Sequence, residues 1–434
     1  MGWKAWSVPE LVTKRPPVRV NQLGYLPDGP KRATLISCSE AGVDFAVRDA
    51  DGAALFVGRS APWPVRPEPT SGLVVHVLDF SELRSRGSGL RVEAAGQRSY
   101  PFDVTDRLYD PLREDALHFF YLMRSGIAIA EQRAPGYARP AGHVGRLPNP
   151  GDTDVAAWTG PDADRLYPGW RQLGKFDVTG GWYDAGDYGK YVTSGAIAVW
   201  QLLGTLDLLA RTRPSVATQR LAGAVIEECS WQLDWLTRMQ IPNGHAMAGL
   251  AFHRVHGTEW SPLPGWPHED PTERVLHRPS TTATLHLAAA TAHGARLLSS
   301  RDQRFARRLL SAARRAYAAA RRHSLLIPPD DHARFGGGPY ADPDPADDFY
   351  WAAAELWLAT GADVYRHDFL ASREHTTEAF DPTGFDFDRV TALARIDLAL
   401  AGAGLDDHAA VVDDVRRGAD RLLELQGRQP WGQP

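Results

Sequence analysis

The sequence predicts a multidomain protein in which a small all-β sandwich precedes an all-α domain built as an α/α toroid. At 434 residues the chain exceeds one ordinary domain. Short β-rich runs give way near residue 108 to a helical spacing of apolar residues, and the later helical segments form pairs of similar length. We therefore expect a sandwich over residues 17–105 and a helical domain over residues 108–434.

The first domain is indicated by short runs of β-branched and aromatic residues that are separated by turn clusters. Several strands at this spacing are typical of a β-sandwich. The expected strands cover residues 18–20, 33–36, 45–47, 73–78, 90–92 and 102–104. Because the segment gathers no titratable groups, we interpret it as a supporting module.

The second domain is indicated by long segments with apolar residues three and four positions apart. The expected helices cover residues 110–123, 192–212, 216–239, 280–298, 305–316, 347–360, 389–400 and 407–425. Long loops rich in glycine and proline surround residues 130–188 and 241–279, and loops of that length usually carry function. Arginine pairs recur on the 305–322 segment, where we expect a solvated outer face.

Composition excludes several classes of partner. A net charge of −5 gives no electrostatic reason to expect nucleic acid. Apolar stretches fall short of the roughly 20 residues of a membrane helix, so we expect no membrane partner. Two cysteines, Cys38 and Cys229, are too few for a disulfide framework. The first residues lack the apolar core of a secretory signal, so either the protein stays inside the cell or its natural start lies elsewhere.

The most informative segment is the run from residue 180 to 191, which holds Asp184 and Asp187 three positions apart. An isolated pair of this kind is more often a helix cap or a solvated turn. Here glycines at 180, 181, 186 and 189 allow close approach of a ligand to the backbone, and aromatic residues at 182, 183 and 188 can stack on sugar rings. The two carboxylates can hold or deprotonate a water molecule.

This run resembles the signature of glycoside hydrolase family 9, the inverting cellulases and their relatives. Further segments match the family in the same order. They are residues 18–25, 119–126, 137–143, 279–284, 336–340 and 347–356. The resemblance implies an immunoglobulin-like first domain, an (α/α)6 toroid and a β-1,4-linked glucan substrate such as cellulose.

The resemblance also implies roles for the two aspartates. Asp187 matches the catalytic base and Asp184 the second carboxylate that helps to hold the attacking water. An inverting glycosidase places its base and its acid roughly 6.5–9.5 Å apart. We expect a helix to start near Gly189, so that its N-terminal amides stabilise the ionised form of Asp187. The alternative is that Asp187 only caps this helix.

Candidate sugar contacts lie in the loops around this motif. Aromatic stacking is expected from Trp182, Tyr188, Trp266 and Tyr340, although buried aromatic residues are the ordinary explanation. His253 lies where the family has a loop that contributes to the cleft. Asp342 follows Tyr340 closely and could accept a hydrogen bond from a sugar hydroxyl.

Hydrolysis of this kind requires no cofactor, and a structural metal is the remaining question. Asp347 and Asp348 match a region that supplies calcium ligands in the family, and hard oxygen ligands suit calcium. An aspartate before a helix can also be simply a cap. Some relatives carry a zinc-binding cysteine where this chain has Gly142, so we expect no zinc here.

The later motifs of the family, a His-Arg segment and an acidic segment with the general acid, are not found before Pro434. About eight of twelve toroid helices can be counted, so the toroid is expected to be incomplete. Glu424 or Glu355 could replace the acid if burial raised its pKa, although an ordinary helix-face glutamate is the simpler interpretation. A catalytically impaired glycan-binding remnant, or a relative acting like an exo-β-glucosaminidase on amino-sugar oligosaccharides, remains an alternative to the cellulase.

Overall fold

The structure is a computed structural model that describes residues 15–145, 149–158, 173–328, 336–380 and 384–432. Its residues divide into two compact units, Met1–Asp115 with Ala419–Pro434 and Ala116–Gly418. This division groups the last residues with the β-rich unit, whereas the sequence placed the whole of 108–434 in the helical domain. Trp431 accounts for the grouping, because its indole nitrogen donates to Glu68 at 3.0 Å and Arg19 lies over its ring.

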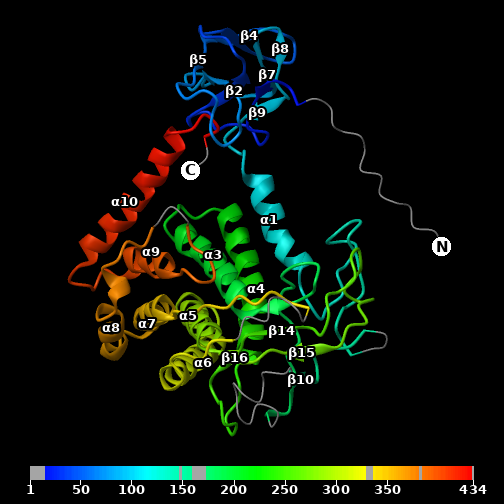
Figure 1. Ribbon diagram of the computed structural model, residues 1–434, viewed down its shortest axis with the longest axis vertical. Coiled ribbons are helices and arrows are strands. Elements are labelled where there is room, and N and C mark those ends of the chain that lie inside the picture. Colours follow the sequence, from blue (N-terminus) through cyan, green and yellow to red (C-terminus); the bar gives the residue numbers. More distant parts are fainter. Residues whose placement is uncertain (1–14, 146–148, 159–172, 329–335, 381–383, 433–434) are drawn as a thin grey trace, which may run out of the picture. The chain divides into compact units, whose positions relative to one another are not determined.

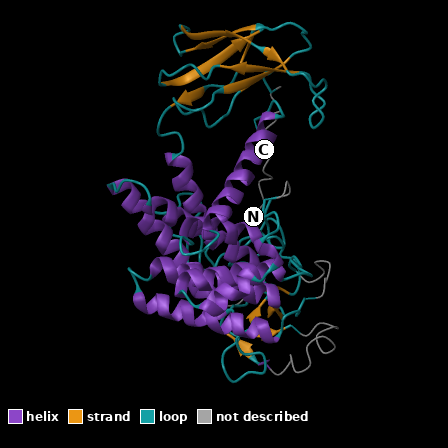
Figure 2. Ribbon diagram, turned by 90° about the vertical axis from the view of Figure 1, so that its left-hand side faces the viewer, coloured by secondary structure: helices purple, strands orange, loops and turns teal. Residues whose placement is uncertain are grey.

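The first unit is a β-sandwich with two antiparallel sheets, drawn in orange in Figure 2. One sheet has the order β1 (Val18–Arg19), β2 (Arg32–Ile36), β6 (Val75–Asp79) and β5 (Ala61–Pro62). The other has the order β4 (Ala54–Arg59), β3 (Asp44–Arg48), β7 (Gly87–Ala94) and β8 (Gln97–Arg98), and β9 (Phe102–Val104) also pairs with β7. Alternate residues of the strands are buried, as a sheet with one face in the core requires. The predicted sandwich is confirmed.

The second unit is a helical toroid whose consecutive helices form hairpins (Figure 1). Its described helix pairs are α3 (Val192–Ala210) with α4 (Val216–Arg238), α5 (Thr281–Leu298) with α6 (Gln303–Arg322), and α7 (Ala346–Thr360) with α8 (Asp363–Leu370). Helix α9 (Thr391–Ala401) and then α10 (His408–Gly427) follow, and the residues of α10 from Ala419 onward are grouped with the first unit. A further helix, α1 (Asp110–Leu122), comes before them. Helix α5 packs against α3 and α7, and α7 packs against α9, so these four form the inner layer. The predicted α/α architecture is confirmed.

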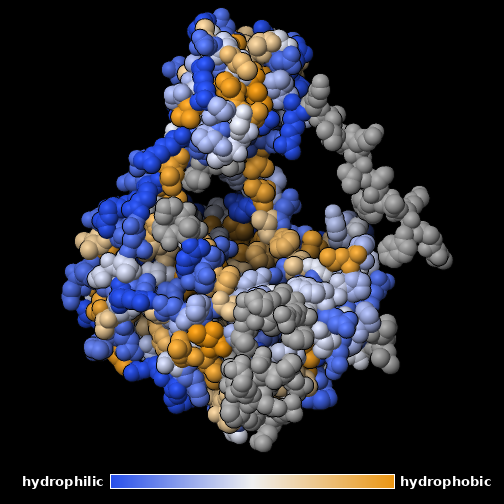
Figure 3. All heavy atoms as spheres, viewed as in Figure 1, coloured by the Kyte–Doolittle hydropathy of each residue, from blue (hydrophilic) through white to orange (hydrophobic). Residues whose placement is uncertain are grey.

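Composition explains which helices lie inside. Helix α5 is rich in alanine and threonine and buries nearly its whole circumference, because small side chains let several neighbours approach it. Helix α6 is strongly amphipathic: Leu309, Ala312 and Ala316 are buried, while its arginine pairs are exposed. The arginine face is therefore solvated, as expected. The face of the molecule drawn in Figure 3 carries hydrophilic and hydrophobic residues side by side.

Short strands connect the inner helices at the end where they begin. One sheet has the order β11 (Lys175–Phe176), β10 (Val155–Ala157), β15 (Arg274–Leu276), β14 (Arg254–Gly257) and β12 (Lys190–Tyr191). A second pairs β13 (Ala251–Phe252) with β16 (Pro279–Ser280). Strand β12 leads directly into α3, so this sheet holds the segment that follows the two motif aspartates.

Helix α3 corrects one expectation from the sequence. By length and composition it could cross a membrane, although no apolar stretch was expected to approach that length. In this structure it packs against α4 and α5 and buries Val192, Ala196, Val199 and Leu203 against them. It is a helix of the toroid's inner layer.

Candidate active site

The segment with Asp184 and Asp187 forms a tight turn between strands β11 and β12 of the sheet. The Asp184 amide donates to the carbonyl of Gly189 at 2.8 Å, which closes the turn. At Gly181 a side chain would meet the Trp235 ring at 2.6 Å and the backbone has a φ of +74°, so glycine is required there. Helix α3 begins at Val192, after a short strand, so the expectation of a helix starting near Gly189 is wrong.

The carboxylate of Asp187 is held by a tyrosine in place of a helix terminus. The Tyr191 hydroxyl donates to Oδ2 at 2.7 Å and accepts from the Gly338 amide at 3.0 Å. Burial, followed by the charge of Asp187, raises the pKa of Tyr191, so its hydroxyl stays protonated. Oδ1 is buried and has no hydrogen-bond partner among the described residues. One oxygen is fixed, and the other makes no hydrogen bond to a described residue.

Asp184 is exposed and is oriented by a second tyrosine. The hydroxyl of Tyr340 donates to its Oδ2 at 3.3 Å. Loss of solvation around the carboxylate, and then the charge of Asp187, raise the pKa of Asp184, while the Tyr340 hydrogen bond opposes this rise. The ring of Tyr340 contacts the ring of Tyr191, with centroids 4.8 Å apart. The two carboxylates thus lie beside each other with one tyrosine each.

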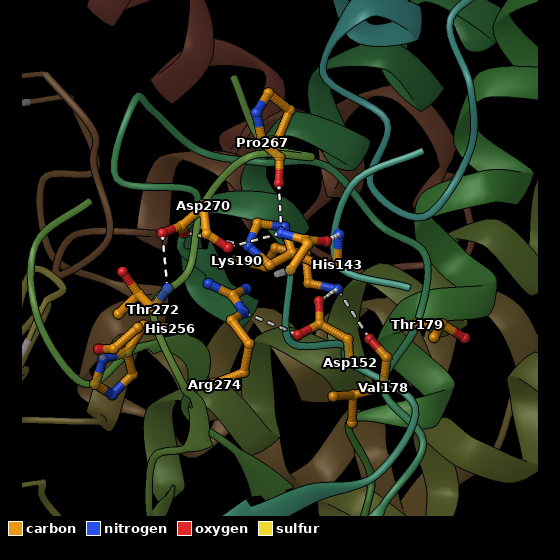
Figure 4. Close-up of polar contacts among 12 residues, drawn as sticks. His143, Asp152, Val178, Thr179, Lys190, His256, Pro267, Asp270, Thr272 and Arg274 are labelled. Carbon is orange, nitrogen blue, oxygen red and sulfur yellow. Dashed lines mark hydrogen bonds and ion pairs between the residues drawn. The ribbon is translucent and has the colours of Figure 1, made fainter. Parts of the chain in front are cut away.

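A buried ion-pair network anchors the strand behind the turn (Figure 4). Asp152 lies 2.8 Å from Nζ of Lys190 and 2.9 Å from Nε of Arg274, and all three side chains are excluded from solvent. Burial alone would raise the pKa of Asp152, but the two cations hold it well below its usual range. Burial lowers the pKa of Lys190 to about 8, against the opposing effect of Asp152.

A second set of contacts connects this network to Asp187 itself. His143 contacts Asp270 at 3.3 Å and the hydroxyl of Tyr183 at 2.7 Å. The Ser261 hydroxyl is 2.9 Å from the Asp270 carboxylate and 3.2 Å from the carbonyl of Asp187. The position of Asp187 therefore depends on contacts with buried side chains from several strands and loops.

A cavity of about 150 Å³ opens beside Asp184. Aromatic and small side chains line it. They are Phe119, Phe120, Met123, Trp182, Tyr183, Asp184, Tyr191, Ser194, Gly195, Ala198 and Gln232. The indole nitrogen of Trp182 donates to Glu228 at 2.8 Å, which fixes the ring against Phe120. Flat apolar faces next to a carboxylate are suited to a sugar ring.

Three buried carboxylates gather at the start of α7. One oxygen from each of Asp342, Asp347 and Asp348 lies within 4.8 Å of the other two. Burial, and then the charge of Asp348, raise the pKa of Asp342 to about 8 and that of Asp347 to about 7. His286 contacts Asp348 at 2.7 Å. Such crowding of like charges suits a bound cation.

Two family models match the chain. The sequence model of "Glycosyl hydrolase family 9" matches residues 109–429, and that of "Cellulase N-terminal ig-like domain" matches residues 13–99. The chain belongs to glycosyl hydrolase family 9. The predicted immunoglobulin-like domain and family 9 toroid are both confirmed.

Among the family 9 relatives are two curated proteins. Endoglucanase C of Cellulomonas fimi is 46% identical over 96% of this chain and 38% of its own length. Cellulose 1,4-beta-cellobiosidase of Acetivibrio thermocellus is 36% identical over 98% of this chain and 51% of its own. The chain thus spans about half the length of these relatives or less.

Two solved structures show the same fold. "Bacteroides ovatus GH9" aligns with a TM-score of 0.80 at 25% identity, covering 96% of this chain and 75% of that chain. AaCel9A "in complex with cellobiose-like isofagomine" aligns with a TM-score of 0.77 at 26% identity, covering 96% and 72%.

The structure corrects two of the sugar contacts expected from the family 9 resemblance. His253 is fully buried and contacts Ser280 and the Pro339 carbonyl, so the expectation of a substrate contact is wrong. Asp342 is 2% exposed and faces Asp347 and Asp348, so it is not placed to meet a sugar hydroxyl.

The remaining aromatic candidates occupy different positions in this family 9 site. Tyr188 is largely buried, and its hydroxyl donates to the Gly265 carbonyl at 2.5 Å. Trp182 lines the cavity beside Asp184, and the Tyr340 hydroxyl donates to Asp184. The side chain of Trp266 is 44% exposed, so solvent reaches it. Phe119, 52% exposed at the cavity, was not singled out from the sequence as a sugar contact, because an aromatic residue on a helix more often belongs to the core.

Neither glutamate considered as the general acid fits that role. Glu355 is fully buried among the inner helices. The Glu424 side chain is 61% exposed and pairs with Arg428, so it is not the buried glutamate that this role requires.

Proposed function

We propose that this protein is an inverting hydrolase of β-1,4-linked glucans. The observation that carries the proposal is the Asp187 carboxylate, which has one oxygen fixed by Tyr191 and one buried oxygen with no hydrogen bond among the described residues. Family 9 membership and relatives named endoglucanase and cellobiosidase support a glucan substrate. The aromatic cavity beside Asp184 supports a sugar ring as the bound group.

In this proposal Asp187 is the general base. It removes a proton from a water molecule that attacks the anomeric carbon, and Asp184 orients the same water. Tyr191 and Tyr340 keep the two carboxylates in place. The water attacks from the face opposite the leaving group, the glycosidic C–O bond breaks, and the departing oxygen takes its proton from solvent or from an acid other than the residues named above. The anomeric configuration inverts, so a β-linked substrate yields an α-anomer first.

The test is hydrolysis of cello-oligosaccharides followed by proton NMR of the anomeric signals. We expect the α-anomer to appear before mutarotation, and no hydrolysis of chito-oligosaccharides. First appearance of the β-anomer would contradict an inverting mechanism. Turnover of amino sugars alone would favour the glucosaminidase alternative, and binding without turnover would favour the glycan-binding remnant.

Tyr340→Phe should shift the acid limb of the pH profile to higher pH. The Tyr340 hydrogen bond lowers the pKa of Asp184, so its removal raises that pKa further and leaves more Asp184 protonated at a given pH. The measurement is kcat/KM on cello-oligosaccharides against pH. Tyr137→Phe, at a 64% exposed position, is the control and should leave the limb unchanged. A shift to lower pH would refute the assigned role of Tyr340.

We further propose that the cluster of Asp342, Asp347 and Asp348 binds calcium. The donors fit, because all are carboxylates and the second oxygens of Asp342 and Asp348 lack hydrogen bonds among the described residues. The alternative of a simple helix cap does not fit Asp347, because Pro345 is the N-cap of α7 and Asp347 accepts from the Val390 amide at 2.7 Å. At Gly142, a side chain would lie 2.9 Å from Pro267, which supports the expectation of no cysteine zinc site there.

Calcium should raise the melting temperature of chelator-treated protein. A ligand at 100 times its Kd stabilises the folded state by about 2.7 kcal/mol, which corresponds to a rise of roughly 5 °C for a domain of this size. Differential scanning fluorimetry with and without excess Ca²⁺ measures this rise. Asp348→Asn should abolish it, whereas Asp344→Asn, at an exposed carboxylate beside the cluster, should retain it. An equal response in both variants would exclude this site.

A further inference from the structure

A second group of ionisable side chains lies inside the helical toroid, away from the active site. Each of the four inner helices contributes one carboxylate or imidazole: Asp207 from α3, His293 from α5, Glu355 from α7 and Asp397 from α9. Asp207 follows the first residue of α3 by fifteen positions, which is about 22 Å along a helix. The group is therefore distinct from the turn that precedes α3.

The side chains converge on His293. One of its ring nitrogens, Nδ1, is 3.6 Å from Oε1 of Glu355 and 3.8 Å from Oδ2 of Asp397. The other, Nε2, is 3.7 Å from Oδ2 of Asp207. One donor atom from each of Asp207, His293 and Asp397 lies within 4.8 Å of the other two.

These groups are buried and poorly satisfied. His293 and Glu355 are both 0% exposed. Among the residues that the structure describes, neither nitrogen of His293 and neither carboxylate oxygen of Glu355 makes a hydrogen bond. Buried polar groups without partners are costly, so their concentration at one point indicates that something binds there.

The charges of the cluster also indicate that a cation binds there. Three carboxylates face one guanidinium, Arg296, which lies 3.4 Å from Asp207 and 3.9 Å from Glu355. The carboxylates of this cluster therefore outnumber its guanidinium three to one among the described residues.

We propose that Asp207, His293 and Asp397, with Glu355 beside them, bind one divalent transition-metal ion such as Zn²⁺. Imidazole with carboxylates is a donor set that Zn²⁺ accepts without cysteine. Bonds of about 2.0–2.1 Å in a tetrahedral arrangement place donor atoms roughly 3.3 Å apart, so the three side chains, whose donor atoms lie within 4.8 Å of one another, would close around the ion. The Trp200 indole donates to Asp397 at 2.5 Å and would orient that ligand from outside the first shell. The ion would connect the four inner helices.

The test uses the full chain, without an affinity tag, after treatment with a chelator. Co²⁺ is titrated while its d–d absorption is recorded, and Zn²⁺ bound after dialysis is measured by elemental analysis. His293→Gln removes the central ligand, and His367→Gln, at a histidine whose side chain is 82% exposed, is the matched control. We expect His293→Gln to bind one Zn²⁺ ion per chain fewer than His367→Gln. The absorption spectrum of tetrahedral Co²⁺ should appear in the unsubstituted protein and in His367→Gln, but not in His293→Gln.

A second variant protects the test against misfolding. Asp397→Asn keeps the shape of the side chain, and it should also lose the equivalent while circular dichroism shows an intact helical fold. Equal metal content in both histidine variants would overturn the proposal. So would the absence of a Co²⁺ spectrum in the unsubstituted protein, because protonation of Glu355 would then be what satisfies the cluster. Asp348→Asn, in the other acidic cluster, should leave the Zn²⁺ equivalent in place.

Discussion

Asp187→Asn is expected to lower kcat on cello-oligosaccharides by about 10²–10⁴, the usual contribution of a general base. The amide keeps the size of the side chain and can still accept from the Tyr191 hydroxyl, but it cannot take a proton from water. The fold should therefore be preserved while the chemical step fails. Initial rates at saturating substrate measure the effect, and isothermal titration with cellotetraose should show binding retained.

The control for this substitution is Asp177→Asn. Asp177 lies ten residues earlier in the same segment, is 53% exposed at its side chain, and pairs with Arg238 at the surface. We expect its kcat to match that of the unsubstituted protein. Full activity of Asp187→Asn would refute the assignment of the base, and a comparable loss in both variants would indicate a general disturbance of the loop.

The largest effect on stability is expected from Asp152→Asn. This change leaves Lys190 and Arg274 as two buried cations without their shared carboxylate. Removing one partner of a buried ion pair typically costs about 3–5 kcal/mol, because the remaining charge keeps its desolvation penalty. For a unit of this size that is a fall in melting temperature of roughly 5–10 °C. Thermal unfolding followed by circular dichroism gives the value.

The matched control is Asp154→Asn, two residues along the same segment. Its carboxylate pairs with Lys175 at 2.7 Å, but both side chains are more than half exposed. Exposed pairs are screened by solvent and contribute little to stability, so the melting temperature should barely move. A similar fall in both variants would show that the segment, and not the buried network, is sensitive to substitution.

Most of the fold could be predicted because apolar spacing is a local property of long elements. The sequence predicted α4 to within a residue, and the structure begins α5 at Thr281, one residue after the expected start at 280. Helix α8 was missed because eight residues with three charged side chains and a histidine show little periodicity. The sheet that holds Lys190 was also missed, since strands of two to four residues leave no pattern above that of a loop.

Of the candidate site, only the residues within the run from 180 to 191 could be predicted, because these lie together in the sequence. The motif gave Asp184 and Asp187, and the structure places both carboxylates in one turn. Tyr191 was missed as the partner of Asp187, because the choice between a tyrosine and a helix terminus depends on where α3 begins. His253 was misassigned because contacts across 27 and 86 residues bury it, and no local signal reports those.

Tyr191 also has a consequence for engineering the substrate range. Its hydroxyl donates a hydrogen bond to Asp187 and accepts one from the backbone amide of Gly338, which lies 147 positions away. A graft that exchanges the Gly338 region for a longer segment would thus alter the position of the hydroxyl that holds the Asp187 carboxylate. Libraries that vary this region should keep a free amide at 338 and exclude proline there, so that changes in selectivity can be separated from changes in turnover.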